Sequence, residues 1–160
     1  MNLYITADKI GGPGGGATVT HHESEALKTL GPCDVWQRDT LAGAGEDPWK
    51  WDEAACAKLS FSLTTYDDIA HFYAGTFSKT IAKLKANGCK VYYTAAAHDI
   101  NKSRQAHEEL GIPYDYPHLS TPELWKRYVA GYLAADVGVC PSKHSADVMR
   151  SYGCKRIEII

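Results

Sequence analysis

Short apolar runs alternate with longer helical patterns from one end of the chain to the other. This alternation is typical of βαβ units, in which a helix connects two neighbouring parallel strands. The apolar runs of strand length occupy residues 3–7, 33–37, 68–72, 90–95, 136–140 and 156–160. The pattern predicts an α/β fold: a Rossmann-like parallel sheet of about six strands with helices on both faces.

The helical patterns are bounded by residues that commonly begin or end helices. Ser142 is an expected N-cap, whereas Gly31-Pro32, Asn87-Gly88 and Gly153 are expected stops. The predicted helices span residues 17–30, 53–59, 76–86, 102–110, 123–134 and 142–152. Residues 38–52, which contain two glycines and a proline, predict an irregular loop. Because the connections are helical, we expect right-handed crossovers and the strand order 3-2-1-4-5-6.

A cluster of glycines follows the first predicted strand. This glycine loop (residues 11–16) reads Gly-Gly-Pro-Gly-Gly-Gly and leads directly into a helix. A helix N-terminus presents free amide groups and positive potential, and glycine lets a ligand approach the backbone closely. Gly14, Gly15 and Gly16 are therefore candidate ligands of a phosphate or diphosphate.

Polar residues also follow other predicted strands, at the edge where open α/β sheets bind ligands. His98 and Asp99 come after the fourth strand, and an imidazole there can hydrogen-bond a sugar hydroxyl or a phosphate. His71, in the third strand, lines the same crevice or is a packed histidine. Ser142 contacts a ligand or serves only as a helix cap.

Composition narrows the classes of function. The formal net charge of −2 gives no general attraction to nucleic acid. The five cysteines are scattered without a C-x-x-C pair, which favours reduced thiols and a cytoplasmic protein over a disulfide framework or zinc site. His21 and Glu25 would share a helical face, but a third ligand in register is missing, so we expect no metal.

A nicotinamide-dinucleotide-binding domain of an oxidoreductase is the alternative reading of the glycine loop. Residues 12–17 satisfy the pattern G-x-G-x-x-A. Three residues, Asp8-Lys9-Ile10, separate the strand from the first glycine, and Asp34 or Asp39 would have to serve as the ribose-binding acid. A stand-alone binding module without catalysis is a further alternative.

Over nearly its whole length, the chain resembles the N-terminal domain of the GT-B glycosyltransferases of family 4. The resemblance is carried by the glycine loop, by residues 68–71 (Asp-Ile-Ala-His) and by Lys90-Val-Tyr-Tyr-Thr94 followed by His98-Asp99. Its most specific part is Tyr132-Leu-Ala-Ala-Asp-Val137, followed by Cys140-Pro-Ser142 and residues 153–160. The family usually has one spacer between the threonine and the His-Asp pair, whereas three alanines stand here.

The resemblance implies a retaining transfer of sugar from a nucleotide-sugar donor, without a cofactor or divalent metal. Residues 1–160 would be the acceptor-side domain, and a donor-binding domain would follow, so the isolated fragment should be inactive. The glycine loop would reach the donor diphosphate, and His98 would contact the donor sugar. The acceptor would be a glycan, a lipid or a small molecule, and the protein would be cytoplasmic or lie peripherally at the membrane. An exposed apolar interdomain face, through which the isolated domain could form a homodimer, is also expected.

Overall fold

The computed structural model describes residues 1–7, 10–41, 48–73, 76–95, 100–113 and 122–160. These residues form a six-stranded sheet in which all five strand pairings are parallel. The strands are β1 (Asn2–Thr6), β2 (Cys33–Trp36), β3 (Ile69–Tyr73), β4 (Lys90–Thr94), β5 (Val137–Cys140) and β6 (Ile157–Ile159). The predicted α/β fold with a parallel sheet is confirmed.

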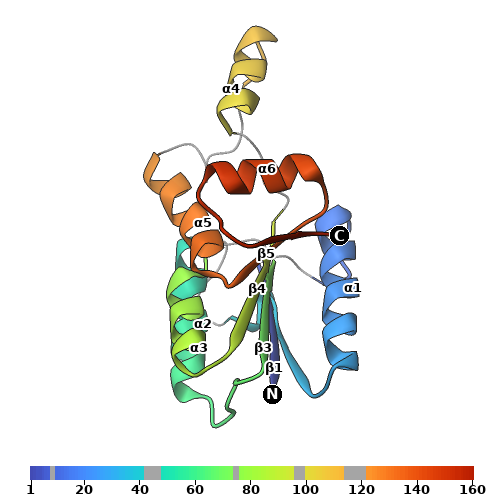
Figure 1. Cartoon of the computed structure of the whole chain (residues 1–160), viewed down its shortest axis with the longest axis vertical. Coiled ribbons are helices and arrows are strands. Elements are labelled where there is room, and N and C mark those ends of the chain that lie inside the picture. The colour runs from blue at the N-terminus through green and yellow to red at the C-terminus, as the bar shows by residue number, and fades with distance from the viewer. Residues whose placement is uncertain (8–9, 42–47, 74–75, 96–99, 114–121) are drawn as a thin grey trace.

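Helices cover both faces of the sheet (Figure 1). They are α1 (Gly15–Thr29), α2 (Pro48–Phe61), α3 (Ser78–Ala86), α4 (Ile100–Glu109), α5 (Pro122–Ala134) and α6 (Lys143–Ser151), with a short 3-10 turn, η1 (Arg38–Thr40). Helix α1 lies on one side, whereas α2, α3 and α5 lie together on the other; α4 projects beyond the sheet (Figure 1). No helix in the described part of the chain is long and apolar enough to cross a membrane.

The strand order is β2-β1-β3-β4-β5-β6, so the predicted order 3-2-1-4-5-6 is wrong. Strand β3 pairs with β1 instead of lying outside β2. Strand β1 is internal in both orders, so they differ in whether β2 or β3 lies at the edge, and β2 is the less buried of the two: one of its four residues is buried, against two of five in β3. A strand that carries Asp34 is better suited to a sheet edge, where one side remains open to water.

The prediction that residues 38–52 form an irregular loop is also wrong in part. Residues 38–40 form η1, and α2 begins at Pro48, five residues before the predicted helix. Proline suits the first turn of a helix because its missing N–H has no partner there in any case. The helix predicted over 53–59 therefore exists but is longer at both ends.

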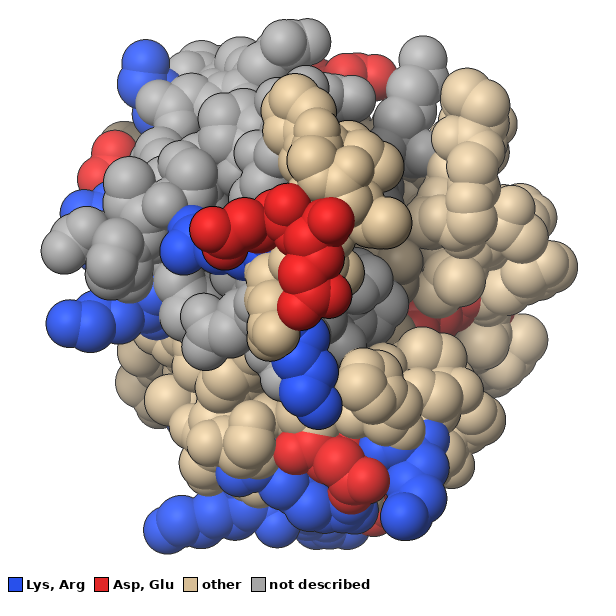
Figure 2. Space-filling model, turned by 90° about the horizontal axis from the view of Figure 1, so that it is seen from above, with Lys and Arg blue, Asp and Glu red and all other residues tan. Residues whose placement is uncertain are grey.

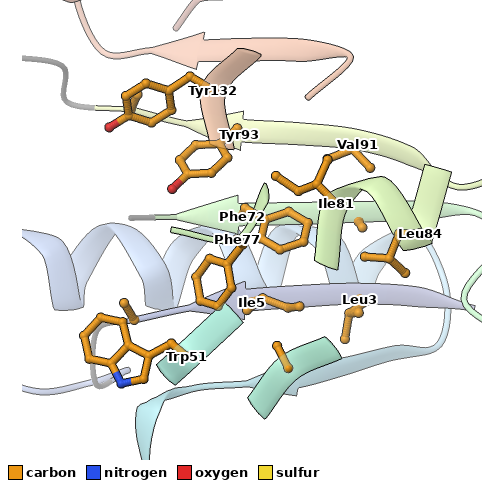
Figure 3. Packing of buried hydrophobic residues seen from close by; sticks show 14 of the residues in the cluster. Leu3, Ile5, Trp51, Phe72, Phe77, Ile81, Leu84, Val91, Tyr93 and Tyr132 are labelled. Carbon is orange, nitrogen blue, oxygen red and sulfur yellow. The ribbon is translucent and has the colours of Figure 1, made fainter. Parts of the chain in front are cut away.

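The main core lies between the sheet and the layer of α2, α3 and α5 (Figure 3). Aromatic rings form its centre: Phe72 stacks on Tyr93 with ring centroids 6.1 Å apart, and Tyr93 meets Tyr132 of α5 edge-on at 4.7 Å. Phe77 packs against Phe72 at the start of α3. This packing fixes the strands whose ends carry the candidate site.

Candidate functional site

The candidate site lies where the order of the strands in the sheet changes direction. From β1 the chain goes to β2 on one side, and it later returns as β3 on the other side of β1. Helices α1 and α3 consequently leave on opposite faces of the sheet (Figure 1). In open α/β folds, ligands bind in the crevice that this divergence opens at the carboxyl edge, the side where the strands end. Here that edge includes Thr6, Tyr73 and Thr94.

The glycine loop lies at this edge and forms the N-terminus of α1. Gly14 is the N-cap residue, with φ 107°, which residues with a side chain rarely adopt. Gly14 and Gly15 are exposed, and a Cβ placed on either would meet nothing within 4 Å. The loop therefore presents its backbone to open space, as an anion site requires.

The first turn of α1 differs from those of α3 and α6, the two other helices whose N-cap the structure describes. The Ser142 hydroxyl caps α6 by accepting a hydrogen bond from the Ser145 amide, at 3.1 Å. Asp52 caps α3 from the neighbouring helix. Among the described residues, no side chain caps α1. Its amide groups and dipole thus remain available to an external anion.

His71 lies in a polar cluster between the sheet and α1, together with Tyr4, Glu23 and Thr94 (the Glu23 cluster). The Glu23 carboxylate accepts hydrogen bonds from the Tyr4 hydroxyl at 2.8 Å and from the Thr94 hydroxyl at 2.6 Å. The His71 Nε2 atom lies 2.8 Å from the Thr94 oxygen and 3.6 Å from Glu23. Because the Thr94 proton points to Glu23, its oxygen must accept from His71, which assigns the Nε2–H tautomer.

The side chains of His71 and Glu23 are only 17% and 12% exposed. His71 is thus packed against α1 and hydrogen-bonded within the cluster, which corresponds to the second of its two sequence interpretations. Glu23 was not predicted as a partner of His71 from the sequence. Its position in α1 gives no local signal, because its partners are contributed by β1 and β4.

The buried imidazole makes the stability of the fold depend on pH. Burial lowers the pKa of His71 below its ordinary value of 6.5, and the nearby Glu23 carboxylate opposes that shift. The unfolded chain therefore binds the proton more tightly than the folded chain. We expect the free energy of unfolding to fall as the pH drops below about 6.5, until the folded-state pKa is passed.

Chemical denaturation between pH 7.5 and 5 would measure this dependence. His71→Gln, which removes the titrating ring but keeps an N–H donor, should flatten it. His22→Gln, at an exposed position on α1, serves as the control and should keep the wild-type slope. Equal slopes in all three proteins would assign the pH dependence to other groups.

The remaining predicted site residues fall into two groups. Ser142 is the N-cap of α6, as predicted, and its contact with a ligand stays a prediction. His98 and Asp99 lie outside the described residues, so their distance from the glycine loop stays a prediction too.

A polar hollow of about 190 Å³ lies beside the N-terminus of α3. It is on the face of the sheet opposite α1, where α2, α3 and α5 pack. It is lined by Asp52, Glu53, Thr76, Ser78, Lys79 and Arg127. Hydroxyls and charges of both signs suit hydrogen bonding to a polar ligand such as a sugar. Acidic and basic side chains are also interspersed over the described part of the face seen from above in Figure 2.

The structure gives little support to cysteine chemistry. All five cysteines are free thiols. Burial raises the pKa of both Cys89 and Cys154 to about 11, which keeps these sulfurs protonated and poorly nucleophilic. Among the described residues, no group of three or more His, Cys, Asp or Glu side chains is arranged to hold a metal ion.

The two candidate acids for a nicotinamide dinucleotide differ in their positions. Asp34, near the start of edge strand β2, accepts a hydrogen bond from the Tyr66 hydroxyl. Asp39 is exposed in η1. Asp34 therefore does not reproduce the ribose-binding acid that follows the second strand in dinucleotide-binding folds, whereas Asp39 does follow β2, so its role as that acid stays a prediction.

The predicted interdomain patch stays a prediction. Among the described residues, several exposed large apolar side chains precede strands and so lie away from the carboxyl edge: Leu30, Phe61 and Leu63. Others, Leu110 and Ile112, follow α4.

Comparison with known proteins adds no assignment: no family model and no curated protein matches the chain.

Proposed function

We propose that this chain is the acceptor-side half of a retaining glycosyltransferase that uses a nucleotide-sugar donor. The observation that carries the proposal is the N-terminus of α1, which no described side chain caps and where Gly14 and Gly15 open onto the carboxyl edge between β1 and β3. A diphosphate accepts hydrogen bonds and carries negative charge, so it matches both the free amides and the helix dipole. The sequence resemblance supplies the reaction class.

In the proposed reaction, the bond between the anomeric carbon and the diphosphate oxygen breaks. A new bond forms between that carbon and an acceptor hydroxyl oxygen, and the hydroxyl proton leaves with the nucleoside diphosphate. The amides of the glycine loop would stabilise the charge that develops on the departing phosphate, because preorganised backbone donors need no reorganisation. The polar hollow beside α3 would hold part of the acceptor on this domain.

The test is a titration of residues 1–160 with UDP- and GDP-sugars and with NAD. Binding is monitored through the backbone amide NMR resonances. We expect nucleotide sugars to shift the resonances of Gly14, Gly15, Gly16 and Ala17, with weak affinity because half of the cleft is contributed by the second domain. We also expect sugar transfer only when the sequence downstream of residue 160 is present. A response to NAD alone would support the oxidoreductase alternative, and no response to either ligand would contradict the proposal.

Substitution of Gly14 gives a sharper test, because the chain offers a matched control. Gly14→Ala and Gly88→Ala each place a side chain at a positive φ, of 107° and 87°, with no neighbour within 4 Å. Each should therefore destabilise the fold by about 1–2 kcal/mol. Gly88 follows α3 at the amino end of β4, away from the glycine loop.

Only Gly14→Ala should weaken binding of the nucleotide sugar, by about tenfold or more, because it reorients amides that contact a charged ligand. Thermal denaturation and the same titration measure the two effects. Equal affinities in the two variants would mean that the glycine loop does not bind the diphosphate.

A further inference from the structure

Glu23 connects the helix of the glycine loop to a distant strand. It lies eight residues after Gly15 in α1, about 12 Å along the helix axis. Both oxygens of its carboxylate are engaged, one by Tyr4 of β1 and one by Thr94 of β4. Helix α1 packs mainly against β1 and β2 and meets β3 at His71, so the bond to Thr94 extends its contacts one strand further, to β4.

The bond to Thr94 bears on the candidate site because of where Thr94 lies in the sheet. Thr94 is the last residue of β4, and it is 4% exposed. The following residue is also held, since the Ala95 amide donates to the Val139 carbonyl at 2.9 Å. The chain then continues into the segment that contains His98 and Asp99. One carboxylate therefore joins the element that begins with the glycine loop to the strand that leads to His98.

We propose that Glu23 is a positioning residue that sets the glycine loop relative to the end of β4. This inference rests on the proposed function: it would fix the donor diphosphate relative to the residues that contact the donor sugar. A carboxylate that accepts from two buried hydroxyls holds them more tightly than a neutral acceptor would. Correct placement matters because a displacement of about 1 Å at a reacting centre can cost a hundredfold in rate.

The test compares four variants of the protein that carries this chain. Glu23→Gln keeps the shape of the side chain but replaces one acceptor oxygen by a donor. Thr94→Val removes the bonding hydroxyl, and Thr94→Ser restores it. Glu25→Gln, on the exposed surface of the same helix, removes a surface pair with Lys28 and is the matched control.

Two readouts follow from the proposal. In the ligand-free protein, the amide resonances of Gly14, Gly15 and Gly16 should shift in Glu23→Gln and Thr94→Val, but not in Thr94→Ser or Glu25→Gln. In the active enzyme, the first two variants should lower kcat about tenfold while KM changes less than about threefold. Thr94→Ser should recover most of the wild-type kcat.

The two readouts separate the two proposals. Lack of sugar transfer by the wild-type protein would reject the proposed function but would leave the resonance test intact. Unshifted glycine resonances in folded Glu23→Gln and Thr94→Val would overturn the positioning role. Should Glu23→Gln fail to fold, Thr94→Val, which keeps the carboxylate, decides the question alone.

Discussion

His98→Ala should lower kcat for sugar transfer by about a hundredfold or more in the complete enzyme. This is the scale observed when one preorganised donor to the reacting centre is removed. In the proposed reaction the sugar passes through an oxocarbenium-like state while the diphosphate departs. An imidazole that hydrogen-bonds a ring hydroxyl would hold the sugar in place during that step.

The prediction is specific in two respects. Donor affinity should fall far less than kcat, and the melting temperature should hardly change if His98 lines the cleft. His22→Ala, at an exposed position on α1, is the control and should leave kcat unchanged. A near-normal kcat in His98→Ala would show that His98 takes no part in the reaction. A variant that only unfolds would show that His98 has a packing role.

Asp52→Ala should strongly destabilise the fold, because it removes a buried helix cap. Asp52 is 6% exposed, and its carboxylate accepts from the Lys79 and Thr80 amides at 2.9 and 2.8 Å. It also accepts from the Thr80 hydroxyl at 2.6 Å. Removing it takes the acceptor from the buried Thr80 amide and the part-buried Lys79 amide at the start of α3, while the Thr80 hydroxyl keeps its bond to the main-chain carbonyl of residue 52. Together, the lost cap and the unpaired donors should cost about 3 kcal/mol, or about 10 °C in Tm.

The neighbouring residue provides the control for this prediction. Glu53 forms an exposed pair with Lys79, at 3.6 Å, so Glu53→Ala should cost less than about 1 kcal/mol. Asp52→Asn, which keeps one acceptor oxygen, should fall between the two. Urea denaturation of the three variants measures the order. A loss for Asp52→Ala as small as that for Glu53→Ala would show that water replaces the cap.

Most of the secondary structure could be predicted because its causes are local. The stop at Asn87-Gly88 and the cap at Ser142 depend on residues within one helical turn. The same holds for the glycine loop, whose place before α1 follows from residues adjacent in sequence. Sequence alone therefore determined the parallel α/β class and one candidate anion site.

Tertiary structure decided which of these elements meet. The periodicity of β2 and β3 fits either strand order, and the choice depends on which of the two strands is left at the more exposed edge. Asp52 caps a helix that begins 26 residues later in the chain, and Glu23 bonds to Thr94 across 71 residues. A local pattern cannot specify such pairs, because each depends on the packing of whole elements. The Glu23 cluster could therefore be recognised only once the sheet and α1 were assembled.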